Sequence, residues 1–307
     1  TDGRHAKVQF SNSWYEDASR RDFTFNSIYA DLNGNLYDPF NGKKDLEAGE
    51  VKFIGNAETR IKEDYLRILR YVRFFLNYSK NDHSDEIQKI IRQNINGVAQ
   101  ISPDRLLNEL KKLFSASGFL KLPKDKFCLE IINLIFPQLK NVLIFKNVKN
   151  HAKEVIKSSD FIFLISLMII DETDNSEYFL YKFNISSENK KRIRFLNNIF
   201  SKPLDKNFFS KKNLWKILYF HGNQHLNDLI NFNIVKNKKV DNKIIKIKKF
   251  FNNQSAHKFN IKAKDLMEKF NMKEGKELGQ KLKEIETFWI DNSFKITDKQ
   301  IEKIIKN

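Results

Sequence analysis

The chain has 307 residues, with 55 Lys and Arg against 38 Asp and Glu, a formal net charge of +17 at pH 7. This length allows two or more domains, and the charge favours a polyanionic partner such as RNA. The lone Cys128 excludes an intrachain disulfide and fits a reducing cytoplasm, and the longest apolar run, residues 161–170, is too short to span a membrane.

The N-terminal part of the chain predicts a small sheet. Residues 6–10 and 25–31 are expected strands, and Asn33-Gly34 is a tight-turn signal before a further strand at 35–38. From Ala57 onward the apolar spacing is helical, with prolines marking helix starts or breaks. Residues 161–170 predict a buried helix, and the polar run 252–255 predicts a joint. The sequence therefore predicts a mostly α fold with a small β remnant.

A helix is expected to carry a stripe of charge just after residue 63. Asp64, Arg67, Arg70 and Arg73 follow one another at i+3 steps, so a helix would place one carboxylate beside three guanidinium groups. Apolar side chains lie on the opposite side of this helix. The helix would be anchored by its apolar side and would present its charges to a ligand.

The charged stripe suits a nucleobase. A carboxylate only accepts hydrogen bonds and a guanidinium only donates them, so Asp64 beside Arg67 complements cytosine and adenine. Guanine and uracil would place a carbonyl against the carboxylate and leave buried polar groups unpaired. The alternative interpretation is a solvated helix face with i,i+3 salt bridges.

Several strings resemble the motifs of one enzyme family. Residues 20–24 (RRDFT), 38–46 (DPFNGKKDL) and 63–70 (EDYLRILR) resemble the RRDxT, DxxxGxxDL and EDxxRxxR motifs of class II tRNA nucleotidyltransferases. These are the CCA-adding enzymes and their bacterial poly(A) polymerase relatives. Residues 101–110 resemble the next family motif, S-x-E-R-I-x-x-E-L, with Asp104 where Glu is usual.

The resemblance implies four parts. They are a partial nucleotidyltransferase head, or palm, at 1–55, a helical neck with the base-reading helix at 56–120, a basic helical body at 121–251, and a helical tRNA-binding tail at 252–307. The implied function is template-independent addition of C, C and A to the tRNA 3′ end from CTP and ATP. A poly(A) polymerase, an enzyme adding only CC or A, and a non-catalytic RNA-binding protein stay open.

The resemblance also assigns roles to single residues. It implies that Arg21 and Asp22 bind the ribose and phosphates of the nucleotide, that Asp64 and Arg67 read the base, and that Arg70 and Arg73 face the triphosphate.

A basic stretch, residues 190–250, holds 16 Lys and Arg against three Asp. RNA contact is expected there, although codon bias of an AT-rich genome would also enrich lysine. The expected RNA-binding residues are Lys211, Lys212, Lys238, Lys239 and, in the tail, Lys264.

The family's catalytic Mg²⁺ ions bind a D-x-D pair that lies N-terminal to all of these motifs. Residue 1 falls inside a motif, so we interpret the chain as a fragment whose Mg²⁺ ligands lie outside it. Two-metal phosphoryl transfer needs those carboxylates, so we expect the chain alone to bind tRNA without incorporating nucleotides. The six histidines show no zinc spacing with Cys128, so no metal site is expected within the chain.

Overall fold

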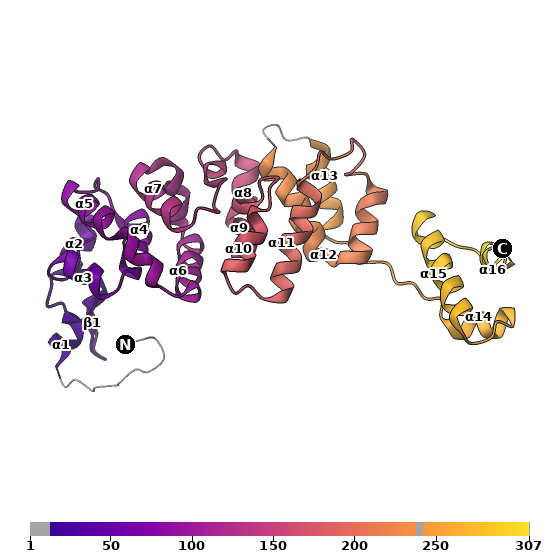
Figure 1. Ribbon diagram of the computed structural model, residues 1–307, viewed down its shortest axis with the longest axis horizontal. Helices are drawn as coiled ribbons and strands as arrows, with labels where there is room; N and C mark the ends of the chain where they lie inside the picture. Colours follow the sequence, from indigo (N-terminus) through magenta and orange to yellow (C-terminus); the bar gives the residue numbers. More distant parts are fainter. Residues whose placement is uncertain (1–12, 238–241, 307) are drawn as a thin grey trace. The chain divides into compact units, whose positions relative to one another are not determined.

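The computed structural model describes residues 13–237 and 242–306, in two compact units, Thr1–Asn197 and Asn198–Asn307. The described residues are mostly helical with one two-stranded sheet, which confirms the predicted fold class (Figure 1). The expected strand at 6–10 lies outside the described residues, and so do Lys238 and Lys239. No described helix is long and apolar enough to cross a membrane.

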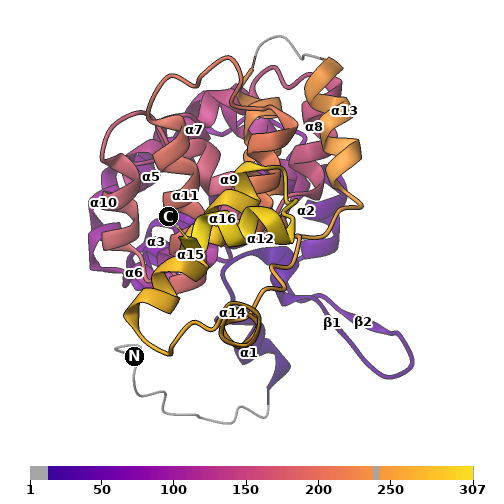
Figure 2. The same cartoon turned by 90° about the vertical axis from the view of Figure 1, so that its right-hand side faces the viewer.

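The first unit begins with short elements around a hairpin. Strands β1 and β2 pair antiparallel, and the hairpin projects beyond the helices (Figure 2). The turn predicted at Asn33-Gly34 is confirmed, since Asp31 accepts the backbone N–H groups of Asn33 and Asn35 and Gly34 has φ +85°. The elements are α1 Trp14–Ser19, the 3₁₀ turn η1 Thr24–Ser27, β1 Tyr29–Ala30, β2 Leu36–Tyr37 and α2 Gly42–Ala48.

The expected strand over residues 25–31 is wrong in its first half. Residues 24–27 form the turn η1, because the Ser27 hydroxyl donates to the carbonyl of Thr24 and the Asn26 side chain donates to Asp22. Such side-chain bonds compete with a strand ladder for the backbone. Only Tyr29–Ala30 of the expected segment pairs as a strand.

The rest of the first unit is a helical array. Helix α4 packs against α6, α7 and η3. Helix α9 is buried along its length, as predicted for residues 161–170, and Asp160 caps its first turn. The elements are α3 Ala57–Glu63, α4 Leu66–Tyr78, α5 Asp85–Asn94, η2 Ile95–Gln100, α6 Pro103–Ser115, η3 Ser117–Lys124, α7 Lys126–Ile135, η4 Val142–Phe145, α8 Asn150–Ser158, α9 Phe161–Ile169, α10 Asn175–Lys182 and α11 Ser187–Phe200.

The second unit holds the C-terminal helices. Residues 252–262, which include the predicted joint, form no regular element, and the last three helices bury their own core around Leu266, Leu278, Ile285 and Ile301. The Tyr219 hydroxyl on α12 donates to Glu286 on α15. The elements are α12 Lys211–Lys236, kinked at Gly222, α13 Asn242–Phe251, α14 Ala263–Phe270, α15 Lys276–Asp291 and α16 Asp298–Lys306.

Only some of the predicted domain limits coincide with breaks in the structure. Helix α3 begins at Ala57 and α13 ends at Phe251, close to the expected limits at 55/56 and 251/252. The boundary between the two units falls at Asn197, within α11 and within the predicted body. The division into four parts therefore stays a prediction.

A close backbone contact fixes α2 against the turn η1. A Cβ atom on Gly42 would lie 2.2 Å from the carbonyl oxygen of Thr24, so only glycine fits there. The Asp38 carboxylate accepts the N–H of Gly42 at 2.8 Å, and the buried Asp45 accepts the Thr24 hydroxyl at 2.8 Å. These contacts hold the segment that carries Asp22.

We predict that Gly42→Ala destabilises the protein by about 1–3 kcal/mol, because the added methyl group overlaps backbone atoms that cannot move independently. Gly279→Ala is the matched control. Gly279 lies within α15 with nothing within 4 Å of its would-be Cβ. Alanine there should stabilise by about 0.5–1 kcal/mol. Urea unfolding of both variants measures the two changes, and equal stabilities of parent and Gly42→Ala would contradict the close approach.

Candidate nucleotide-binding site

The charged stripe expected on one helix is broken at its first residue. Asp64 has the extended angles φ −156° and ψ 103° between α3 and α4, and its carboxylate accepts the backbone N–H of Leu66 at 3.1 Å. A short carboxylate at this place satisfies a free donor of the new helix. The prediction that Asp64 lies on the helix is therefore wrong, although Arg67, Arg70 and Arg73 do lie on α4.

Two buried carboxylates bind the middle of α4. Asp22 is 7% exposed and accepts hydrogen bonds from the Phe23 N–H, the Asn26 amide and Arg70. Glu109 on α6 is 1% exposed and accepts from Arg73, with Arg70 at 3.9 Å. These four charged side chains, Asp22, Arg70, Glu109 and Arg73, form a network that joins the segment before η1 to α4 and α6. We call it the buried ionic network.

The buried ionic network changes the expected geometry of two arginines. The sequence predicted that Arg70 and Arg73 point toward a triphosphate, but the structure turns both guanidinium groups to the buried carboxylates. A buried carboxylate is costly unless it is paired, and these arginines are its partners. Their side chains remain 27% and 15% exposed.

The protonation of Asp22 follows from this network. Burial alone would raise the pKa of Asp22, but the hydrogen bonds from Arg70 and Asn26 and the charge of Arg70 outweigh burial and lower the pKa below its usual value of 3.8. Asp22 is therefore ionised at neutral pH and holds Arg70 in place.

Asp64 and Arg67 lie at the outer edge of the same region. The Asp64 carboxylate binds Arg105 of α6 at 2.7 Å and is 31% exposed. The Arg67 guanidinium binds Glu63 at 2.6 Å and the carbonyl of Arg60 at 2.9 Å. Each half of the predicted base-reading pair thus has an intramolecular partner that a base would have to replace.

The sequence alone assigned no role to Arg105 or Glu109. Arg105 and Glu109 lie one turn apart on α6, so this helix supports Asp64 with one side chain and the arginines of α4 with the other. Both lie in the quoted stretch 101–110, so the i,i+4 spacing of an Arg and a Glu on a predicted helix was the available signal.

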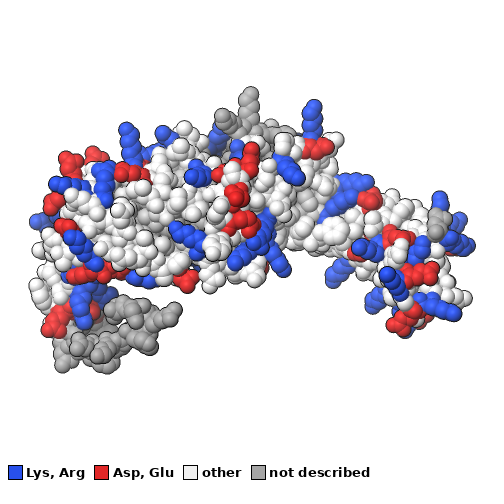
Figure 3. Space-filling view, in the orientation of Figure 1, with Lys and Arg blue, Asp and Glu red and all other residues white. Residues whose placement is uncertain are grey.

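The remaining predicted residues are dispersed. Arg21 binds Asp17 at 2.7 Å and is half exposed. The Lys211 ammonium group lies 4.1 Å from the Phe250 ring, and Lys264 is exposed near Glu268. Acidic and basic side chains are interspersed over helices α14 to α16 (Figure 3).

Part of the charge excess of residues 190–250 is neutralised within the protein. Arg192 is buried against Asp160 at 2.7 Å, and Arg194 binds Glu177 at 2.7 Å. Lys216 binds Asp291. The basic surface available to RNA is therefore smaller than the sequence predicts.

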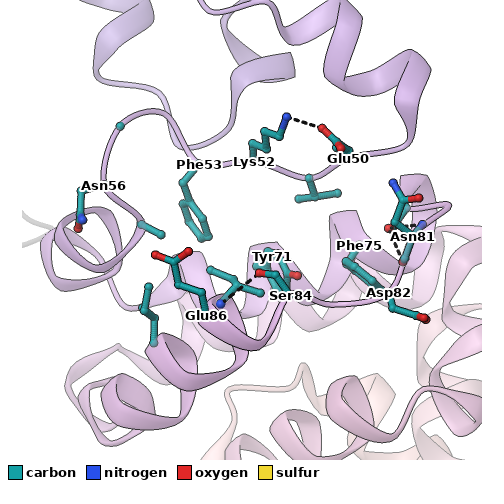
Figure 4. A pocket seen from close by; sticks show the side chains of 16 residues that line it. Glu50, Lys52, Phe53, Asn56, Tyr71, Phe75, Asn81, Asp82, Ser84 and Glu86 are labelled. Atoms are coloured by element: carbon teal, nitrogen blue, oxygen red, sulfur yellow. Dashed lines mark hydrogen bonds and ion pairs between the residues drawn. The ribbon is translucent and has the colours of Figure 1, made fainter.

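A cavity of about 520 Å³ lies beside a different face of α4 (Figure 4). Phe53, Tyr71 and Phe75 provide aromatic walls, and Glu50 and Glu86 add carboxylates. None of the predicted nucleotide-binding residues lines this cavity. The candidate site is therefore the outer edge, where Asp64 and Arg67 lie, and not the cavity.

The two buried carboxylates near α4 are poorly suited to Mg²⁺. Mg²⁺ prefers carboxylate and water oxygens, but Asp22 and Glu109 are already saturated by arginines. Among the residues that the structure describes, the one cluster of three metal-ligating side chains is His83, Asp125 and Cys128. The outer edge places a hydrogen-bond acceptor, Asp64, three residues before a donor, Arg67.

Two family models match the chain. Residues 1–52 match the poly A polymerase head domain, and residues 154–305 match the putative tRNA nucleotidyltransferase domain 2. The Streptococcus uberis CCA-adding enzyme is 29% identical over 291 residues, which covers 92% of this chain and 69% of that protein. Human mitochondrial CCA tRNA nucleotidyltransferase 1 is 49% identical over 115 residues, 37% of this chain and 26% of the relative.

Solved structures share the fold. The Bacillus stearothermophilus CCA-adding enzyme in complex with CTP aligns over 100% of this chain and 76% of that chain, with a TM-score of 0.70 and 18% identity. The Thermotoga maritima CCA-adding enzyme complexed with tRNA_CCA aligns over 95% and 73%, with a TM-score of 0.59 and 19% identity. The sequence matches support assignment of the chain to the class II tRNA nucleotidyltransferase family, which contains the CCA-adding enzymes. The chain spans about a quarter of the length of the vertebrate relatives.

We predict that Asp22→Asn costs about 3–5 kcal/mol of stability, because Arg70 loses a buried charged partner. Asp17→Asn is the control, since Asp17 pairs with Arg21 at the surface and its loss should cost about 0–1 kcal/mol. Guanidinium unfolding compares the variants.

The pH dependence of stability gives a second readout of the same pair. The lowered pKa of Asp22 adds stability that is present above its usual pKa of 3.8 and is lost as the pH falls through the folded-state pKa. The parent should therefore lose more stability on acidification than Asp22→Asn. Equal slopes below pH 3.8 would show that Asp22 is not tied to Arg70.

Proposed function

We propose that this chain is the nucleotide-selecting and tRNA-binding part of an enzyme that adds C, C and A to the tRNA 3′ end from CTP and ATP. The observation that carries the proposal is the convergence of three motif segments at one place. The buried ionic network ties residues 20–24 to α4 and α6, and it leaves Asp64 and Arg67 together at the outer edge.

The chemistry of the outer edge supports selection of C and A. When the base arrives, Asp64 exchanges Arg105 for the exocyclic amino group, and Arg67 exchanges Glu63 for the ring acceptors. Each exchange replaces one charge-assisted hydrogen bond by another, so C and A lose little. U and G would leave Asp64 facing a carbonyl and are rejected. The protein itself acts as the template.

Other assignments complete the proposal. Arg21 is half exposed near the same segment and is available to a phosphate after release from Asp17. Arg70 and Arg73, paired with Asp22 and Glu109, hold α4 in place behind the outer edge. A bound Mg²⁺ would supply charge neutralisation during phosphoryl transfer.

One related function, poly(A) addition, competes with this proposal. A poly(A) polymerase is favoured by one observation, since the model that matches residues 1–52 is described as a poly A polymerase head domain. CCA addition is favoured by relatives that match 92% of the chain and are named CCA-adding enzymes. A cytoplasmic location is our proposal from Cys128, and the vertebrate relatives are named as mitochondrial proteins.

We predict that Asp64→Ala and Arg67→Ala each reduce selectivity against UTP and GTP by about one to two decades, because an unpaired hydrogen-bonding group costs about 1–3 kcal/mol. The measurement is kcat/KM for all four nucleotides, in a polypeptide that extends this chain through a D-x-D segment. The basal rate should fall less than the selectivity.

Tyr65→Phe is the control for nucleotide choice. The Tyr65 ring packs against Gly97 and not at the outer edge, so removing its hydroxyl should leave selectivity unchanged. If Asp64→Ala prefers C and A as strongly as the parent, the outer edge is only a salt-bridged surface and the nucleotide assignment is wrong.

We predict that tRNA affinity falls steeply with salt and that replacing Lys211, Lys212, Lys238 and Lys239 by Gln makes this slope shallower, by up to about 0.9 for each phosphate that is no longer neutralised. The measurement is the Kd of the chain for a tRNA lacking CCA at several salt concentrations. Lys62→Gln is the control, since Lys62 is exposed and pairs with Glu58 outside the basic stretch. An unchanged slope in the quadruple variant would leave codon bias as the explanation of the lysine excess.

A further inference from the structure

Three side chains with metal-binding atoms meet at the start of α7, away from the outer edge at Asp64 and Arg67. His83 lies between α4 and α5, while Asp125 and Cys128 occupy the cap and the first turn of α7. The His83 Nε2 atom lies 3.1 Å from Asp125 Oδ2 and 3.6 Å from Cys128 Sγ. All three ligand atoms lie within 4.8 Å of one another.

The separations match the edges of a zinc tetrahedron. Zinc binds nitrogen and oxygen at about 2.0–2.1 Å and sulfur at about 2.3 Å. Tetrahedral angles then give an N to O separation of about 3.4 Å and an N to S separation of about 3.6 Å. The two observed distances from His83 Nε2 agree with these values to within about 0.3 Å. We propose that His83, Asp125 and Cys128 bind a zinc ion.

The surrounding groups orient the ligands. The Tyr71 hydroxyl lies 2.9 Å from His83 Nδ1, so Nδ1 can carry the proton and leave the Nε2 lone pair for the metal. The Phe75 ring stacks on the imidazole with 3.5 Å between centroids, and the Phe127 ring meets it edge-on. Metal-binding histidines commonly have such a hydrogen-bond partner on the second nitrogen.

The Asp125 carboxylate can serve the helix and the metal at once. Its Oδ1 atom accepts the backbone N–H of Cys128 at 2.9 Å and caps α7, while Oδ2 faces His83. The Asp125 side chain is 20% exposed and the His83 side chain 8%, which gives the ion a path from solvent. On binding, the Cys128 thiol releases its proton to water and a zinc–sulfur bond forms.

The proposed zinc site would be structural. It would join the segment after α4 to the start of α7, and both Tyr71 and Phe75 that contact His83 belong to α4. Three protein ligands leave the fourth tetrahedral position to water. A metal that binds only the folded protein stabilises it in proportion to the logarithm of its concentration over Kd.

The test uses the 307-residue chain after removal of metals with a chelator. Zn²⁺ should bind with one ion per chain and raise the melting temperature. Co²⁺ should bind in its place and give a thiolate-to-cobalt charge-transfer band in the near ultraviolet. Cys128→Ser should abolish the band, and His83→Gln should weaken binding at least tenfold.

Two further variants keep the test independent of folding defects. Asp125→Asn retains an oxygen that can cap α7, so the metal-free protein should melt near the parent while Zn²⁺ affinity falls at least tenfold. His221→Gln with His225→Gln removes the i,i+4 histidine pair on α12, whose rings lie 5.9 Å apart, and should leave the band unchanged. Absence of saturable Zn²⁺ binding, or a band that survives Cys128→Ser, would overturn the site and leave a hydrogen-bonded His–Asp pair.

Discussion

The placement of α4 depends on two buried carboxylates that face its arginines. Asp22 and Glu109 are almost fully buried, and each is paired with a guanidinium group of α4, because an unpaired buried charge is costly. Because Asp22 precedes η1 and Glu109 lies on α6, satisfying both charges fixes α4 against two distant segments of the chain. The close approach at Gly42 then holds the segment of Asp22 from the other side. The arginines thus serve first as structural partners.

Fixing the middle of α4 leaves its N-terminal end available for recognition. Asp64 and Arg67 have partners, Arg105 and Glu63, that are partly exposed and can be exchanged for a ligand. The Asp64–Arg105 pair is the more exposed of the two, and exposed ion pairs contribute little to stability, so releasing this pair costs little. The same sequence motif therefore combines a firmly held helix with an exchangeable outer edge, as the proposed selection of two bases against two others requires.

The sequence predicted the helical fold, the hairpin turn, the buried helix at 161–170 and the residues that gather near α4, because these follow from spacing and turn chemistry. It did not predict that Asp64 leaves the helix, since an i+3 pattern does not reveal a carboxylate that caps the next helix. It also could not assign Arg70 and Arg73 to Asp22 and Glu109, which lie 48 and 36 residues away. The meeting of His83 with Asp125 and Cys128 is likewise set by helix packing across 42 and 45 residues.

The central claim is that Asp64 and Arg67 read the base. A crystal structure of the chain with bound CTP tests it most directly. The cytosine amino group should lie within hydrogen-bonding distance of Asp64 and the ring acceptors should face Arg67, while Arg105 has moved off the carboxylate and Asp22 still binds Arg70. A cytosine bound in the cavity beside Tyr71 and Phe75, with Asp64 still bound to Arg105, would contradict the account.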